Sequence, residues 1–545
     1  MKTKGKVSRV TAFIMTLLMA VSLLCATAFA IEPDEKGTIT VNNVENNVTV
    51  SAYRLMDVKV NENGQPQEPV YTWTDEVADW VRENYPDYIG AADALAGTED
   101  NSVQDDFSTE AETEEIAEFY DALAAAIKTT AGPLEITAAG TCNGSGIIGN
   151  LSMGNYLILI ENGMKVYRPS AVNLVPVWDT ESGQWEMSDA TVEVKSSEPT
   201  ISKTVNADTG SDSAGKEADN ANIGDTVSFE IVADVPKFPA NALAKNYAVS
   251  DILPTGMTLD GDSIEVYGVS GETDAPLEAG DDGAYTLGNA RPNSGGESSF
   301  TLTFAYDKIS SYKKIRVTYS AVLNGNAVLG TSGNVNNAYL DYSNNPYVAE
   351  SWKDKTDSAV VYTYGIDISK VDKGDHENFL AGAKFELYAS ENAAEGGTEA
   401  EKIVFVKESE GVYHRALAGE ENTTTTLVVG ENDALKGRLK VKGLDEGTWY
   451  LKETKAPGGY NLLASPVKVV VTDAEGGVLD GQVIGAAADA SGEAVALVTL
   501  TVKNDNGFLL PVTGGASTVL FAVGGAVLMS AAVICFIAVS KRKNA

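Results

Sequence analysis

Apolar and polar residues alternate with a period of two through most of the chain, which is the pattern of half-buried β-strands. The clearest runs are 38–41, 48–55, 156–160, 224–235, 297–307, 315–323, 366–370 and 498–504. Two stretches have helical spacing instead, 74–84 and 109–128, and the second begins with a Thr109-x-x-Glu112 capping box. These patterns predict a mainly β protein of tandem immunoglobulin-like β-sandwich domains in an elongated array, with short helices in the first domain.

Both ends of the chain have the composition of targeting segments. Residues 1–30 combine a basic start, an apolar stretch and a final Ala-x-Ala, as a signal peptide does. Residues 516–540 contain no charge and precede a basic tail at 541–543, as a membrane helix with a cytoplasmic end does. The predicted boundaries are a signal peptide at 1–30, three exterior blocks at 31–197, 198–363 and 364–507, and a C-terminal sorting region at 508–545.

Charge and composition argue against several classes of function. The 545 residues include 77 acids and 40 lysines and arginines, a formal net charge of −37, which disfavours nucleic acid as a partner. Two histidines and three scattered cysteines give no cluster for a metal, so no metal and no cofactor are expected. Outside the two terminal segments the only cysteine is Cys142, so no internal disulfide is expected.

Side chains alternate between the two faces of a strand, so the odd or even position of a residue, here called strand parity, predicts which face it occupies. Strand parity places three reactive side chains in the interior of the third block. Lys370 shares a face with Ile366 and Ile368. Asn504 shares a strand face with Val498, Leu500 and Val502. Glu453 shares a strand face with Trp449 and Leu451. Burial favours a neutral amine and a neutral acid. The amine can then attack the Asn504 carboxamide with Glu453 as the acid, expelling ammonia and forming a Lys370–Asn504 isopeptide bond. The plain alternative is a surface ion pair and a turn residue.

Two segments of this block resemble a known family. Residues 371–389, VDKGDHENFLAGAKFELYA, and 450–460, YLKETKAPGGY, resemble the collagen-adhesin B-type domain of Gram-positive pilins. The ETKAPGGY segment is similar to the pilin E-box, and this resemblance implies that Glu453 is the catalytic acid.

The middle block resembles the pilin D2 family in VSDILPTGMTL (249–259) and NNAYLDYSNNP (336–346). That family forms the same kind of bond from a lysine, an aspartate and an asparagine, which implies Lys203, Asp251 and Asn336. Parity favours Asn336 over Asn337, although a one-residue bulge would exchange them. The first block has no inward lysine in its opening strands, so it is predicted to lack an internal bond.

The C-terminal LPVTG resembles the cell-wall sorting signal of Gram-positive surface proteins. Its residues are Leu510, Pro511, Val512, Thr513 and Gly514, followed by the apolar span and the basic tail. The resemblance implies that a sortase cleaves after Thr513 and transfers its carbonyl to an amine. The alternative is an ordinary membrane anchor with an incidental LPVTG.

Major pilins place the lysine that accepts this carbonyl in a Val-x-Val-Tyr-Pro-Lys motif. Here Val192-Glu193-Val194-Lys195 ends the last strand of the first block just before the linker, although Tyr-Pro is absent and the lysine comes two residues earlier. Lys195 is the first choice for the linking lysine and Lys165 the second; the alternative is that Lys195 is a solvated linker lysine.

The resemblances imply a structural shaft subunit of a sortase-polymerised pilus, anchored in a Gram-positive cell wall and outside the cell. The implied partners are a pilus-type sortase, a wall-anchoring sortase, identical subunits joined head to tail, accessory pilins and peptidoglycan. No enzymatic activity is expected beyond the self-directed bond formation. The alternative function is a monomeric wall-anchored adhesin that binds a host ligand. A hydrolase is disfavoured by the scarcity of histidine.

Overall fold

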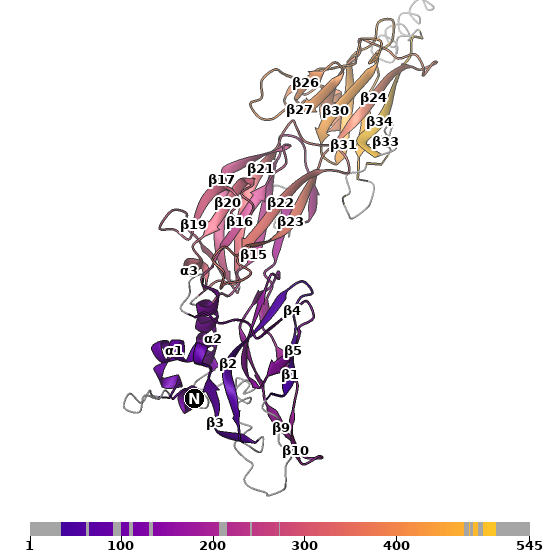
Figure 1. The fold of residues 1–545 in the computed structure, drawn as a ribbon. Coiled ribbons are helices and arrows are strands. Elements are labelled where there is room, and N and C mark those ends of the chain that lie inside the picture. Colours follow the sequence, from indigo (N-terminus) through magenta and orange to yellow (C-terminus); the bar gives the residue numbers. More distant parts are fainter. Residues whose placement is uncertain are drawn as a thin grey trace, which may run out of the picture.

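The computed structural model describes most of the chain between residues 34 and 507. The described ranges are 34–61, 65–90, 100–107, 113–129, 134–206, 215–239, 242–271, 273–473, 479, 483–484, 486–488 and 494–507. The predicted signal peptide, the capping box at 109–112 and the sorting region with Leu510, Pro511, Thr513 and Gly514 lie outside them. Within the described ranges, no helix combines the length and the apolar character needed to cross a membrane. Three successive β-rich units form an elongated array (Figure 1).

The first unit is built on a central sheet whose two faces are both covered. Its elements are β1 (Lys36–Asn42), β2 (Thr49–Val60), β3 (Pro66–Trp73), α1 (Asp75–Asn84), η2 (Pro86–Tyr88), α2 (Thr113–Lys128), β4 (Gly140–Asn143), β5 (Ile147–Ser152), β6 (Gly154–Glu161), β7 (Val166–Tyr167), β8 (Ser170–Leu174), β9 (Pro176–Asp179), β10 (Gln184–Met187), β11 (Ala190–Glu193) and β12 (Ser196–Ser197). The central sheet has the order β3-β2-β6-β8, with β4 also paired to β2, and a second sheet has the order β11-β1-β5. Because successive strand residues point to opposite faces, Val50 packs toward the β11-β1-β5 sheet while Leu55 packs toward the helices.

The two helices lie where the sequence pattern predicts them, within the described residues. On α1 the buried face includes Val77, Trp80 and Val81. On α2 it includes Phe119 and Leu123. Their apolar faces form one core with the outer face of the central sheet, as amphipathic helices on a sheet do.

The second unit is a sandwich of two sheets around one core. Its elements are β13 (Ile201–Asn206), β14 (Ala218–Asn220), β15 (Thr226–Asp234), β16 (Tyr247–Ile252), β17 (Met257–Ser270), β18 (Thr273–Pro276), β19 (Tyr285–Ala290), β20 (Glu297–Phe304), α3 (Tyr306–Ile309), β21 (Lys314–Leu323), β22 (Asn334–Tyr342) and β23 (Lys353–Tyr362). The sheet orders are β13-β15-β21-β17-β18 and β14-β23-β22-β16-β20-β19. The first and last long strands, β13 and β23, lie beside each other across the two sheets, since the Lys203 backbone N–H donates to Asp357 of β23 at 2.7 Å.

The third unit is a second sandwich. Its elements are β24 (Tyr364–Asp372), β25 (Lys384–Tyr388), α4 (Glu391–Gly396), η4 (Glu399–Glu401), β26 (Phe405–Ser409), β27 (Val412–Arg415), β28 (Thr423–Thr424), β29 (Leu427–Val428), β30 (Arg438–Leu444), β31 (Gly447–Lys455), β32 (Val467–Val471), β33 (Ala486–Ala488) and β34 (Ala494–Asn504). The sheet orders are β28-β26-β27-β30-β24-β34-β33 and β29-β25-β31-β32. The first strand β24 and the last strand β34 are therefore parallel neighbours within one sheet.

Specific contacts join the units. Between the first and second, the Tyr347 hydroxyl donates to Asp121 at 2.5 Å and both side chains are buried. Between the second and third, Asn220 donates to Glu446 at 2.7 Å, and Arg415 lies 3.1 Å from Asp225. The prediction of a mainly β array of tandem sandwiches, with helices in the first, is confirmed (Figure 1).

Candidate functional site

Lys370 and Asn504 lie on the two neighbouring parallel strands that open and close the third unit. Lys370 of β24 pairs with Val502 of β34, so Asn504 is two residues further along and on the same face. Glu453 reaches the same interior from β31, in the opposite sheet. The exposed fractions are 0% for Lys370, 1% for Asn504 and 3% for Glu453. The structure thus brings together three polar side chains from three strands in a core of apolar residues.

The three side chains contact one another. The Lys370 Nζ donates to the Asn504 Oδ1 and, at 3.2 Å, to the Val502 carbonyl oxygen. The Asn504 Nδ2 donates to the Glu453 Oε2 at 2.9 Å, and the Glu453 Oε1 lies 3.6 Å from Nζ. The carboxyl group therefore faces both the amine and the amide nitrogen.

Burial changes the acid–base behaviour of this amine. It lowers the pKa of Lys370 to about 8, although the nearby Glu453 acts in the opposite direction. About one amine in ten is then neutral near pH 7, far more than for an exposed lysine. Only the neutral amine has the lone pair that attacks a carbonyl carbon, so the site favours nucleophilic chemistry.

The second unit contains a corresponding cluster. Lys203 of β13, Asp251 of β16 and Asn336 of β22 are 1%, 0% and 0% exposed. The Lys203 Nζ donates to the Asp251 Oδ2. Asn336 is buried, whereas Asn337 points to the other face and is half-buried. The arrangement brings together the three residues implied by the family resemblance, with Asn336 rather than Asn337 facing the lysine side of the core.

A fourth side chain, Tyr319 of β21, belongs to this cluster and was not anticipated from the sequence. Its hydroxyl oxygen accepts a hydrogen bond from the Lys203 Nζ at 2.6 Å and another from the Asn336 Nδ2 at 2.8 Å. The available signal was parity, because Tyr319 alternates with apolar residues at 315, 317, 321 and 323 that are all buried.

The pKa values of the amine and of the carboxyl group in this second cluster are shifted in opposite directions. Burial lowers the pKa of Lys203, against the attraction of Asp251. Burial raises the pKa of Asp251, against Lys203 and the hydrogen bonds of its neighbours. Both shifts favour the neutral amine and the neutral acid over the ion pair.

The described part of the first unit contains no buried lysine. Lys195 is exposed between β11 and β12, and its carbonyl oxygen accepts a hydrogen bond from the Arg168 N–H at 3.0 Å. Lys165 is half-buried, and its backbone N–H donates to Glu45 at 3.0 Å. Cys142 is free and half-buried. No group of three or more His, Cys, Asp or Glu in the described ranges is arranged to hold a metal ion.

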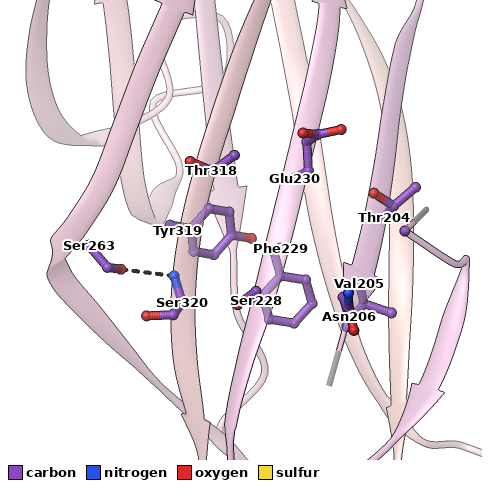
Figure 2. A pocket seen from close by; sticks show the side chains of 11 residues that line it. Thr204, Val205, Asn206, Ser228, Phe229, Glu230, Ser263, Thr318, Tyr319 and Ser320 are labelled. Atoms are coloured by element: carbon purple, nitrogen blue, oxygen red, sulfur yellow. Dashed lines mark hydrogen bonds between the residues drawn. The ribbon is translucent and has the colours of Figure 1, made fainter. Parts of the chain in front are cut away.

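An open pocket of about 410 Å³ lies against β13, β15, β17 and β21 (Figure 2). Its lining is rich in hydroxyl groups, and the Ser320 N–H donates to the Ser263 hydroxyl at 2.8 Å, a bond marked by the dashed line in Figure 2. Among the described lining residues the one acid is Glu230, which lies 3.4 Å from Arg316. The described lining therefore contains neither paired carboxylates nor a Ser–His pair.

Tandem sandwiches with a buried Lys–acid–Asn cluster in each of the last two units define an extended structural protein rather than one built around a cleft. Comparison with known families agrees with that class. Residues 223–346 match the Gram-positive pilin backbone subunit 2, Cna-B-like domain, and residues 365–482 match the SpaA prealbumin-like fold domain.

Known proteins with similar sequences are pilus or surface proteins. The chain is 26% identical over 394 residues to the trypsin-resistant surface T6 protein of Streptococcus pyogenes serotype M6, covering 64% of this chain and 70% of that protein. It is 25% identical over 348 residues to the type 1 fimbrial subunit of Actinomyces viscosus, covering 58% of this chain and 62% of that protein.

A solved structure agrees in fold. The T6 backbone pilin of serotype M6 Streptococcus pyogenes, described as a modular three-domain structure, superposes with a TM-score of 0.53 at 17% identity. The match covers 88% of this chain and 95% of that one. The domain matches and the relatives together show that the chain is similar to Gram-positive backbone pilins and contains two domains of the kind found in them.

Proposed function

We propose that this chain is the shaft-forming subunit of a covalent pilus on a Gram-positive cell surface. The observation that supports this proposal best is the dry contact of Lys370, Glu453 and Asn504 between the first and last strands of the third unit. A pilus shaft bears tension, and a covalent bond between these strands passes the load along the chain without straining the hydrogen bonds of the sheet. The domains proposed are 31–197, 198–363 and 364–507.

The chemistry proposed for each cluster is an amide exchange. The neutral lysine Nζ attacks the Cγ of the asparagine and forms a new C–N bond. The C–Nδ2 bond then breaks, and one amine hydrogen is transferred to the departing nitrogen, which leaves as ammonia. Glu453 in the third unit polarises the carbonyl and moves the proton, and Asp251 in the second unit polarises the carbonyl. The products are the Lys370–Asn504 and Lys203–Asn336 bonds.

Assembly is proposed to follow from the LPVTG sequence. A pilus-type sortase cleaves after Thr513 and joins its carbonyl to Lys195 of the next subunit. A wall-anchoring sortase later transfers the finished polymer to peptidoglycan, and accessory pilins join the same fibre. Lys195 supports this order because it is exposed, whereas Lys203 and Lys370 are buried.

An immunoblot of wall extracts tests the proposal. Mutanolysin-solubilised walls of the native strain, boiled in SDS, are expected to give a ladder of bands at multiples of the subunit mass. Deletion of the pilus-type sortase should reduce the ladder to a monomer band. A single band in the unmodified strain would support the monomeric adhesin instead.

A further inference from the structure

The two clusters differ in what lies between the reacting nitrogens. In the third unit, the Glu453 carboxyl faces both nitrogens directly, at 2.9 Å from the Asn504 Nδ2 and 3.6 Å from the Lys370 Nζ. In the second unit, the Asp251 carboxyl also lies beside both side chains, and a tyrosine hydroxyl is placed between the two nitrogens in addition. The Tyr319 oxygen accepts hydrogen bonds from the Lys203 Nζ at 2.6 Å and the Asn336 Nδ2 at 2.8 Å.

The fold holds this hydroxyl in place. The Tyr319 ring stacks on Phe229 at 5.4 Å between centroids and meets Phe300 edge-on at 5.0 Å. Figure 2 shows the rings of Tyr319 and Phe229 lying beside each other on β21 and β15. With 3% of its surface exposed, the side chain has little freedom to move its hydroxyl away from the two nitrogens.

The acidity of the phenol also matters. Burial and the neighbouring Asp251 raise the pKa of Tyr319 well above its usual value, so the hydroxyl is protonated throughout the physiological range. Such a group cannot release its proton to water. It can still give that proton to one neighbour while it receives another from a second neighbour, because its own charge then does not change.

From this geometry we infer that Tyr319 is a further catalytic residue of bond formation in the second unit, acting as the proton relay between the two nitrogens. The inference deepens the proposed isopeptide chemistry and rests on it. Once the Lys203 Nζ has bonded to the Asn336 Cγ, the new ammonium nitrogen gives one proton to the Tyr319 oxygen. Tyr319 gives its original hydroxyl proton to Nδ2, the C–Nδ2 bond breaks, and ammonia leaves. Tyr319 ends unchanged, and Asp251 holds the amine and polarises the amide.

The competing explanation is that Tyr319 only fills space against Phe229 and Phe300. A phenylalanine would fill that space equally well, so the two explanations predict opposite outcomes for Tyr319→Phe. Tyr247 provides a matched control. It is buried in the same sandwich, and its hydroxyl donates to the Ala233 carbonyl oxygen rather than to either reacting nitrogen.

The experiment follows bond formation in freshly synthesised protein. Residues 31–509 are made in a short cell-free pulse, and samples are digested at intervals. Mass spectrometry then measures the Lys203–Asn336 and Lys370–Asn504 cross-linked peptides in the same molecules. Tyr319→Phe is expected to slow the Lys203–Asn336 bond about a hundredfold, the lower end of the range of about 10²–10⁴ for loss of an acid–base group. The Lys370–Asn504 bond should form at the wild-type rate in that variant, because it lies in the separate core of the third unit.

Two further variants complete the test. Tyr247→Phe should form both bonds at the wild-type rate. Ile309→Ala, in α3, loosens the same core but keeps the hydroxyl and the two rings beside it, so it should lower the unfolding temperature and leave the rate of bond formation within about twofold. A wild-type rate in Tyr319→Phe, or an Ile309→Ala rate as slow as that of Tyr319→Phe, overturns the relay alone. Absence of the Lys203–Asn336 peptide from the wild type overturns the proposed chemistry itself, and the relay with it.

Discussion

Lys370 and Asn504 are 134 residues apart in the chain but lie on adjacent parallel strands, with the Lys370 Nζ against the Asn504 side chain. A bond between them would close nearly the whole third unit into a ring. Closing a loop of that length restrains the unfolded chain in the way a long-range disulfide does, and by that comparison stabilises the unit by about 5 kcal/mol. This is a large share of the stability of an ordinary domain.

The first prediction concerns mass and the catalytic acid. Purified residues 31–509 should be lighter than the sequence mass by two ammonia units, without any added enzyme. Glu453→Ala should restore one of them and lower the unfolding temperature of the third unit, because the Asn504 amide loses the acid that contacts it. Glu395→Ala, which changes an exposed site in the same unit, should still be lighter than its sequence mass by two ammonia units. Intact mass spectrometry and calorimetry measure these outcomes, and a full-sequence mass for the wild type contradicts the prediction.

The second prediction separates two neighbouring asparagines. Asn336→Ala should prevent the bond in the second unit and reduce its free energy of unfolding by about 5 kcal/mol, the value for a cross-link of similar span. Asn337→Ala changes the opposite face of the same strand and should keep both the bond and most of the stability. Peptide mapping and urea unfolding give the two readouts. Loss of the bond in Asn337→Ala instead would assign the reaction to Asn337.

Strand parity was enough to predict the interior positions of Lys370, Glu453 and Asn504, because a period of two fixes the face once one strand is correctly placed. It also distinguished Asn336 from Asn337, since β22 has no bulge between residue 334 and residue 340 where it pairs with β16 and β23. The tandem sandwiches followed from the same pattern.

Parity could not identify Tyr319 as part of the second cluster. An inward tyrosine on a strand normally packs in a core, and the sequence does not show which strands of the opposite sheet its hydroxyl meets. Sheet order is non-local, as in β13-β15-β21-β17-β18, so the meeting of Tyr319 with Lys203 depends on long-range pairing. The contacts between units, such as that of Tyr347 with Asp121, are non-local for the same reason.

The third prediction is a pH dependence that appears only without the cross-link. In Asn504→Ala the bond cannot form, and Lys370 remains a buried amine whose pKa lies near 8, below the 10.5 of an exposed lysine. Between these values the unfolded chain binds more protons at this site than the folded chain does. Stability therefore rises with pH across that window, by up to about 3 kcal/mol.

The double variant Lys370→Met/Asn504→Ala is the matched control for this prediction, because it lacks the amine and shares all the other titrating groups. The unfolding free energies of the two variants are measured by denaturant titration from pH 7 to pH 10. As pH rises, the single variant should become more stable relative to the double variant. A difference that does not vary with pH contradicts the buried-amine assignment.

The fourth prediction concerns anchoring. Thr513→Ala should remove the covalently wall-linked fraction and leave the protein in the membrane fraction and the medium, because the sortase lacks its cleavage residue. Thr518→Ala, just beyond the LPVTG segment, should anchor normally. Cell fractionation with and without muralytic digestion measures both. An unchanged wall-linked fraction in Thr513→Ala would identify the C-terminal segment as an ordinary membrane anchor.

The last prediction is the joint between subunits. A sortase that holds the Thr513 acyl group needs an exposed amine, and Lys195 is exposed at the end of the first unit, beside the linker to the second. Lys203 is excluded because it is buried and because the proposed internal bond would consume its amine. Digested fibres should therefore contain a Thr513–Lys195 linked peptide. Lys195→Ala should leave wall-anchored monomer without a ladder, and Lys195→Arg should behave in the same way, because it keeps the charge but removes the nucleophilic amine. If the ladder persists in both variants, the joint lies at another lysine, and Lys165→Ala is the next variant to test.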